Sequence, residues 1–140
     1  MGYLVDTNVF SELAKAKPDA MAVQWLRDHE AEIYISTVSV GEIRRGIEAM
    51  HAGKRKTSLQ VWLTELCYRM EGRILSYNTS VAHVWGQMLA RCDKRGISLP
   101  SLDSLLAATA LRHNLTMATR NVSDFQHTGV KVVNPFSTKG

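Results

Sequence analysis

Cysteine and long apolar runs are scarce in this 140-residue chain. Its two cysteines, Cys67 and Cys92, lie in stretches of helical periodicity and form no Cys-x-x-Cys pair, which is too few for a secreted domain that depends on disulfides. No apolar segment approaches the roughly 20 residues that cross a bilayer, and the N-terminus lacks the features of a signal peptide. We therefore expect a cytoplasmic protein with reduced thiols and no membrane contact.

Other signatures are missing as well. The five histidines show no paired spacing, which argues against a zinc site built from His and Cys. No phosphate-binding loop or dinucleotide fingerprint occurs, which disfavours a nucleotide- or NAD-dependent enzyme. Apolar residues make up 45% and charged residues 21% of the chain, as in an average globular protein. Because there is no internal repeat or linker-like segment, the sequence predicts one domain over residues 1–140.

The chain carries a small basic excess, 17 Lys and Arg against 13 Asp and Glu, for a net charge of +4. Such an excess permits a polyanionic partner such as nucleic acid but does not require one. The basic residues concentrate between Arg44 and Arg73, a stretch that contains seven Lys and Arg but only three Glu. This stretch is either a solvated helical hairpin or a surface that guides RNA, and both interpretations stay open.

Short apolar segments alternate with stretches of helical periodicity along the chain. Strands are expected at residues 3–5, 33–35, 74–75, 115–119 and 130–133. Between them, apolar residues recur at steps of three and four, as in amphipathic helices, and Ser101 after Pro100 is the expected N-cap of one helix. This alternation predicts an α/β domain with a mainly parallel sheet, whose site lies at the carboxyl ends of the strands.

Acidic residues occur where these strands are expected to end. Asp6 ends the first strand, and Glu42 lies near the entry to the helix after the second. Asp103 is in the opening turn of the helix at Ser101, and Asp124 follows the strand at 115–119. Carboxylates that gather at one sheet edge repel one another. A hard divalent cation such as Mg²⁺ or Mn²⁺ removes that conflict and can activate water near a phosphate.

Each acid also has a simpler explanation when it is taken alone. Asp6 and Asp124 are ordinary turn or cap residues, and Asp103 complements a helix dipole. Glu42 could be a solvated helix residue paired with a neighbouring arginine. Their joint placement at successive strand ends is what favours a site.

Five segments, in order and with similar spacing over nearly the whole chain, resemble the PIN-domain family. They are Leu4–Asn8, Ser36–Glu42, Asp103–Ala110, Thr116–Phe125 and Val132–Phe136. Within that family the chain looks most like the VapC-type toxins of bacterial toxin–antitoxin pairs, including their FitB-like relatives. The resemblance implies a three-layer α/β/α fold with a mainly parallel central sheet of four to five strands.

The resemblance also implies a Mg²⁺- or Mn²⁺-dependent endoribonuclease, the toxin of a type II pair, which hydrolyses RNA and inhibits translation and growth. Asp6 and Asp103 match the metal ligands of the family, and the position of Glu42 completes the metal site. Asp124 is expected as the fourth catalytic acid. Asn121, which stands where some relatives have Asp, is the alternative.

The same resemblance implies a set of substrate-binding positions and partners. The expected substrate-binding residues are Thr7, Asn8, Thr119, Arg120 and Asn121. The expected substrate is RNA, with tRNA among the candidates. The expected protein partners are a second copy of the chain and a cognate VapB-type antitoxin, which together form a hetero-oligomer.

Two other classes of function compete with the nuclease. An Asp at a strand end can be the nucleophile of a phosphatase or phospho-acceptor domain, with Asp6 in that role. A phosphatase of the haloacid-dehalogenase type would have a second Asp where this chain has Asn8, and the acidic pair and late Lys of a receiver-like domain are also missing. The remaining alternative is a non-catalytic RNA-binding module with the same fold.

Overall fold

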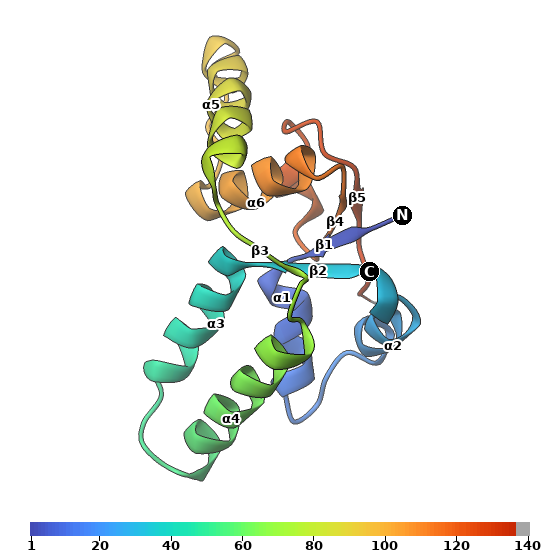
Figure 1. Ribbon diagram of the computed structural model, residues 1–140, viewed down its shortest axis with the longest axis vertical. Coiled ribbons are helices and arrows are strands. Elements are labelled where there is room, and N and C mark those ends of the chain that lie inside the picture. Colours follow the sequence, from blue (N-terminus) through green and yellow to red (C-terminus); the bar gives the residue numbers. More distant parts are fainter. Residues whose placement is uncertain (137–140) are drawn as a thin grey trace.

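The computed structural model describes residues 1–136 and has a five-stranded parallel sheet at its centre (Figure 1). The strand order is β3-β2-β1-β4-β5, and all four pairings are parallel. The strands are β1 (Tyr3–Val5), β2 (Ile33–Ser36), β3 (Ile74–Leu75), β4 (Thr116–Ala118) and β5 (Val132–Val133). The last four residues of the single domain predicted over 1–140 lie outside the described residues.

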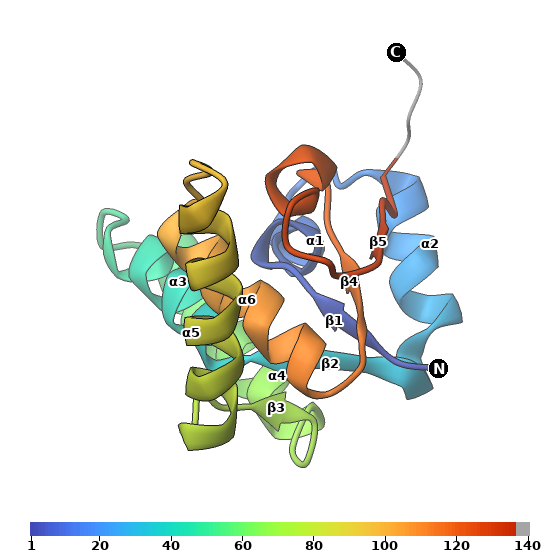
Figure 2. The ribbon, with the colours of Figure 1, turned by 90° about the horizontal axis from the view of Figure 1, so that it is seen from above.

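Helices connect the strands and cover both faces of the sheet. They are α1 (Thr7–Phe10), α2 (Ala20–Asp28), α3 (Thr37–Glu48), α4 (Lys54–Arg69), α5 (Thr79–Lys94) and α6 (Ser101–Arg112). Three short 3₁₀ turns add Ser11–Ala14, Glu30–Glu32 and Val122–Phe125. In Figure 1, α5 and α6 lie above the sheet and α1 to α4 lie below it. In Figure 2, β1, β4 and β5 run between α6 and α2. The predicted three-layer α/β/α fold is confirmed.

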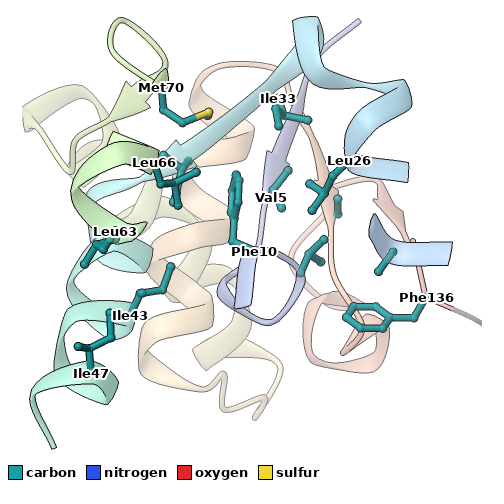
Figure 3. Close-up of a cluster of buried hydrophobic side chains, with 14 residues drawn as sticks. Val5, Phe10, Leu26, Ile33, Ile43, Ile47, Leu63, Leu66, Met70 and Phe136 are labelled. Carbon is teal, nitrogen blue, oxygen red and sulfur yellow. The ribbon is translucent and has the colours of Figure 1, made fainter. Parts of the chain in front are cut away.

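Two apolar cores, one on each face of the sheet, hold these layers together. Consecutive strand residues point to opposite faces, so that Leu4 belongs to the core with α5 and α6 while Val5 belongs to the core with α1 to α4. Figure 3 shows the second of these cores, where Phe10 and Leu26 pack around Val5. Full burial of each such side chain contributes about 1.5–3 kcal/mol. The cores fix the layers and so the edge at which the strands end.

Two helix starts follow from capping and residue type. The helix α1 begins at Thr7 because the Asp6 carboxylate caps it. The helix α4 begins at Lys54 in a basic run, since Lys and Arg are good helix formers. The expected N-cap Ser101 is instead the first residue of α6, and its carbonyl accepts a hydrogen bond from Ser104 Oγ.

Both cysteines are free thiols, Cys67 half-buried on α4 and Cys92 buried on α5. The Cys92 Sγ lies 3.7 Å from the carbonyl oxygen of His127, to which it donates. Over residues 1–136, no helix combines the length and the apolar character that a bilayer span requires.

Candidate active site

The carboxyl ends of β1, β2 and β4 lead into the segments that carry three of the four predicted acids, and the fourth lies at the start of α6, the helix that precedes β4. Asp6 directly follows β1 and caps α1, while Glu42 lies in α3, which starts where β2 ends. Asp103 lies in the first turn of α6, and Asp124 lies in the turn that follows β4. The field of Asp124 acts on both Asp6 and Asp103, and so does the field of Glu42. Parallel pairing therefore brings together the four acids that the strand-end argument selected.

Asp6 is the most buried of these acids, with 5% of its surface exposed. Its Oδ1 accepts a hydrogen bond from Thr7 N (2.7 Å), and its Oδ2 accepts one from Thr119 Oγ1 (2.7 Å) and one from Asn8 Nδ2 (3.4 Å). Burial raises the pKa of Asp6, the bonds from Thr119 and Thr7 oppose that rise, and the nearby negative charge of Glu42 adds to it. The carboxylate is thus held in one orientation by three donors.

The carboxyl groups of Asp103 and Asp124 lie close enough for a side-chain hydrogen bond between them when one is protonated. Burial, the charges of Asp6 and Asp124, and this hydrogen bond raise the pKa of Asp103 to about 6. Two carboxyl groups this close repel each other when both are ionised, so a positive charge beside them is favourable. Asp124, rather than Asn121, is therefore the acid that meets Asp103, and its catalytic role stays a prediction.

Glu42 is oriented by the first turn of α1. Thr7 Oγ1 donates to Glu42 Oε1 at 2.7 Å, across 35 residues of sequence. The second carboxylate oxygen, Oε2, is not used by this bond. Thr7 was expected to bind substrate, and in the structure its hydroxyl positions Glu42.

The other predicted substrate-binding residues form a polar network beneath the acids. Thr119 has no exposed surface and its hydroxyl donates to Asp6, which orients that carboxylate; a contact of Thr119 with substrate stays a prediction. Asn121 N donates to the same Thr119 Oγ1 at 3.0 Å. Asn8 Oδ1 accepts from Arg120 N at 3.3 Å. These bonds tie the loop after β4 to α1.

The Arg120 guanidinium lies 4.2 Å from the centre of the Phe136 ring, a cation–π arrangement. Its positive charge also acts on Glu12, on the side of α1 that leads toward α2. Arg120 is exposed, so a contact with a phosphate stays a prediction.

Within residues 1–136 the four acids have no basic partner. Among residues 1–136, no Lys, Arg or His lies within ion-pair distance of Asp6, Glu42, Asp103 or Asp124. All the donor atoms that this edge offers are hard oxygens, which suit Mg²⁺ or Mn²⁺. In the same part of the chain no three acidic, His or Cys side chains converge on one point, so the expected set of Asp6, Glu42 and Asp103 is not assembled around an ion. Because Mg²⁺ takes one or two carboxylates and completes its shell with water, the residues fit it.

One buried acid was missed by the strand-end argument. Glu12, in the 3₁₀ turn after α1, is 2% exposed, forms an ion pair with Lys15 and accepts a hydrogen bond from Asp19 N at 2.8 Å. Burial alone would raise the pKa of Glu12, but these partners and the charge of Arg120 outweigh it and lower that pKa. The Glu12–Lys15 spacing of three residues was the available sequence signal.

The basic stretch between Arg44 and Arg73 is largely occupied by contacts within the chain. Arg44 and Lys56 both pair with Glu48, and Arg55 donates to the carbonyl oxygen of Ala14. Arg73 donates to the carbonyl oxygens of Glu30, in the 3₁₀ turn before β2, and of Ile33, the first residue of β2. It also lines a cavity of about 570 Å³ between α2 and α4. These contacts favour the solvated hairpin over a continuous RNA-guiding surface.

Comparison with known proteins agrees with this geometry. The model of the PIN domain matches residues 3–131. The "VapC ribonuclease Y4jK" of Sinorhizobium fredii is 36% identical over 95% of this chain and 96% of its own length, and "Toxin FitB" of Neisseria gonorrhoeae is 35% identical over 95% and 97%. The structure of FitAB bound to an IR36 DNA fragment superposes with a TM-score of 0.90, at 31% identity, over 99% of this chain and 98% of that one.

The match of the family model spans nearly all the described residues, and it contains each of the four acids. The resemblance inferred from the five sequence segments is therefore confirmed. The chain belongs to the PIN-domain family.

Proposed function

We propose that this protein is a Mg²⁺- or Mn²⁺-dependent endoribonuclease, the toxin of a type II toxin–antitoxin pair, acting in the cytoplasm on RNA and so inhibiting translation and growth. The observation that carries the proposal is the cluster of four acids drawn from four separate segments, without a basic partner among residues 1–136. A fold that gathers repelling carboxylates at such an edge favours a cation supplied from outside the chain.

The relatives support the same activity. Two proteins with more than a third of their residues in common with this chain, over nearly their whole length, are named a VapC ribonuclease and a FitB toxin. Their names agree with the nuclease rather than with a binding module alone.

Asp6 and Asp103 would hold the metal, with Asp124 next to Asp103. When bound, the ion supplies an activated water and neutralises charge on the phosphate. Glu42 is placed to take up a proton, because Thr7 fixes its Oε1 and leaves Oε2 for the water. Thr119 and the backbone of Thr7 keep Asp6 from turning away.

The phosphatase alternative has less support. A phosphatase of the haloacid-dehalogenase type would have a second Asp where this chain has Asn8, and the Asn8 amide instead donates to Asp6. The two relatives with more than a third of their residues in common with this chain are named a ribonuclease and a toxin.

The proposal includes an antitoxin of the VapB type and a homodimer of the toxin, which together make a hetero-oligomer. The acid cluster suits inhibition by a basic residue from a partner, since an arginine would meet carboxylates that have no ion pair within residues 1–136. The solved FitAB structure bound to a DNA fragment, whose matching chain is 31% identical to this one, supports a complex of this kind.

Purified protein, freed of metal and then supplied with Mg²⁺ or Mn²⁺, tests the proposal on a mixture of cellular RNA that includes tRNA. We expect internal cleavage that EDTA stops, that Asp6→Asn abolishes and that a matched surface variant, Asp28→Asn on α2, leaves unchanged. Growth arrest on expression should follow the same pattern. Metal-independent cleavage, full activity of Asp6→Asn, or a covalent aspartyl-phosphate at Asp6 would contradict the proposal.

A further inference from the structure

We propose that Tyr77, braced by Trp85, is a stacking platform for an unpaired nucleobase of the RNA, at the same edge of the sheet as the acid cluster. This inference rests on the proposed ribonuclease function and names a residue that binds its substrate. Tyr77 lies in the loop between β3 and α5, two residues after β3 ends at Leu75.

The platform lies at the same edge of the sheet as the acid cluster. β3, β2 and β1 are neighbours and run parallel, so their carboxyl ends point the same way. Adjacent strands are about 4.8 Å apart, which puts the end of β3 about 10 Å from the end of β1. Asp6 directly follows β1, and Figure 1 shows the loop after β3 rising past this end of the sheet toward α5. About two nucleotides of an extended strand cover that distance.

A chain of contacts connects Tyr77 to the segment that carries Asp103. The Tyr77 and Trp85 rings meet edge to face, with centroids 6.4 Å apart and planes at 83°. The indole Nε1 of Trp85 donates to Ser104 Oγ at 3.0 Å, and that hydroxyl donates to the carbonyl oxygen of Ser101 at 2.6 Å. Ser104 is the residue after Asp103. The position of the aromatic pair is therefore fixed relative to the first turn of α6.

Tyr77 keeps 39% of its surface exposed although it is packed against Trp85. An edge-to-face contact does not cover a ring as a parallel stack does, so ring surface is left for a planar ligand. Nucleobases stack on such rings whatever their sequence, because every base has a π-face. An exposed aromatic ring that is held in place at the edge of a phosphate-cleaving centre gains more free energy from stacking with a nucleobase than from contact with water.

The charge of this edge favours the same interpretation. Four carboxylates repel the phosphates of an approaching RNA, and three of the six basic side chains of α3 and α4 are engaged elsewhere. Stacking does not depend on charge, so it can hold RNA where the electrostatic field cannot. A base inside a duplex has both faces covered by its neighbours, and therefore only an unpaired base can occupy the platform.

The test measures binding without cleavage, in the Asp6→Asn background, with a short single-stranded RNA that the wild type cuts. We expect Tyr77→Ala to weaken binding about tenfold and Tyr77→Phe, which keeps the ring, to change it less than twofold. The slope of affinity against salt should stay the same, because no phosphate contact is removed. Tyr68→Ala is the matched control, since Tyr68 is 79% exposed on α4, away from this edge.

A second measurement does not depend on the variant's folding. RNA with an abasic nucleotide at each position around the cut should bind the Asp6→Asn protein more weakly at one position only, and at that position Tyr77→Ala should cause no further loss. Unchanged affinity of Tyr77→Ala, an equal loss in Tyr68→Ala, or a change in oligomeric mass of Tyr77→Ala would overturn the inference. If the wild type cuts RNA and Tyr77 has no effect, this inference alone fails. If the wild type cuts no RNA, the proposed function fails with it.

Discussion

Two buried carboxyl groups, Asp6 and Glu12, lie close together in the chain, and their surroundings shift their pKa values in opposite directions. Glu12 is buried with Lys15 against it and with the charge of Arg120 nearby, and its pKa is lowered despite burial. Asp6, six residues earlier, is buried beside other acids, and its pKa is raised by burial and by Glu42. The same kind of group is thus stabilised as an anion in one place and destabilised as an anion in the other.

The difference separates a structural acid from a functional one. Glu12 receives its positive charge from the chain itself, so its pairing is complete once the protein folds. Asp6 receives hydrogen bonds and Asp103 lies beside Asp124, but neither receives a cation from the described residues, so a positive charge from outside the chain gains the most there. If this contrast is correct, removing one carboxylate from each region should damage different properties.

The largest expected effect is the loss of activity in Glu42→Gln. Glutamine keeps the acceptor for Thr7 Oγ1 but cannot take up a proton, so RNA cleavage should fall by about 10²–10⁴-fold. Unfolding by urea should be almost unchanged. Glu12→Gln is the matched variant, which should keep its cleavage rate per folded molecule while it loses stability. The contrast breaks if Glu12→Gln loses as much activity as Glu42→Gln.

The sequence predicted the gathering of the acids because their placement follows from topology. Once strands and helices alternate, parallel pairing sends Asp6, Glu42, Asp103 and Asp124 to one edge, whatever the details of packing. The fold was predictable for the same reason, since the period of apolar residues decides which face of each element is buried.

The roles within the site were less predictable, because they depend on which side chains meet across long separations. The hydroxyl of Thr119 donates to Asp6 across 113 residues of sequence. Nothing in the sequence around Thr119 distinguishes a threonine with this contact from one that binds substrate. Glu12 has the local pattern of a solvated helix residue, and only tertiary packing buries it. The start of α6 was predicted one residue late, because Ser101, the expected N-cap, is the first residue of the helix and Pro100 holds the cap position.

In the structural region, Glu12→Ala should cost about 2–3 kcal/mol of unfolding free energy. The substitution removes a charged acceptor from the Asp19 N–H and from Lys15 in a buried place. Lys15→Ala should cost only about 0.5–1 kcal/mol, because Lys15 is half exposed. Urea unfolding at pH 7 measures both. Equal costs for the two variants would mean that the ion pair, and not the burial of Glu12, sets the stability of this turn.

In the site, a divalent cation should stabilise the folded protein. A ligand that binds only the native state adds about 2.7 kcal/mol when its concentration is 100 times its Kd. Mg²⁺ added to metal-free protein should therefore raise the melting temperature by several degrees, and Asp103→Asn should remove most of that rise. Glu12→Gln should lower the starting temperature but keep the rise. A rise that survives in Asp103→Asn would place the cation elsewhere.

The two regions should also respond to pH with opposite sign. The pKa of Asp103 is raised from 3.8 to about 6, so between these values the folded state binds the proton more tightly, and metal-free protein should lose stability as the pH rises through that window. The pKa of Glu12 is lowered from 4.5, so its contribution is present above that value and is lost as the pH falls through the folded pKa. Urea unfolding across pH 3–7 should show the first slope disappear in Asp103→Asn and the second in Glu12→Gln. Slopes that persist in these variants would assign the titrations to other groups.

The smallest expected effect concerns buried serines, which extend the comparison to neutral groups. Ser39 on α3, one turn before Glu42, is fully buried and its hydroxyl has no hydrogen-bond partner among the described residues. Ser104 on α6 is equally enclosed, but it accepts from Trp85 and donates to Ser101. Because an unpaired buried hydroxyl carries a desolvation cost, Ser39→Ala should raise the unfolding free energy by about 0.5–1 kcal/mol, whereas Ser104→Ala should lower it by about 1–2 kcal/mol. If Ser39→Ala instead destabilises the metal-bound protein but not the metal-free one, that hydroxyl belongs with Asp6 as a group whose partner comes from outside the chain.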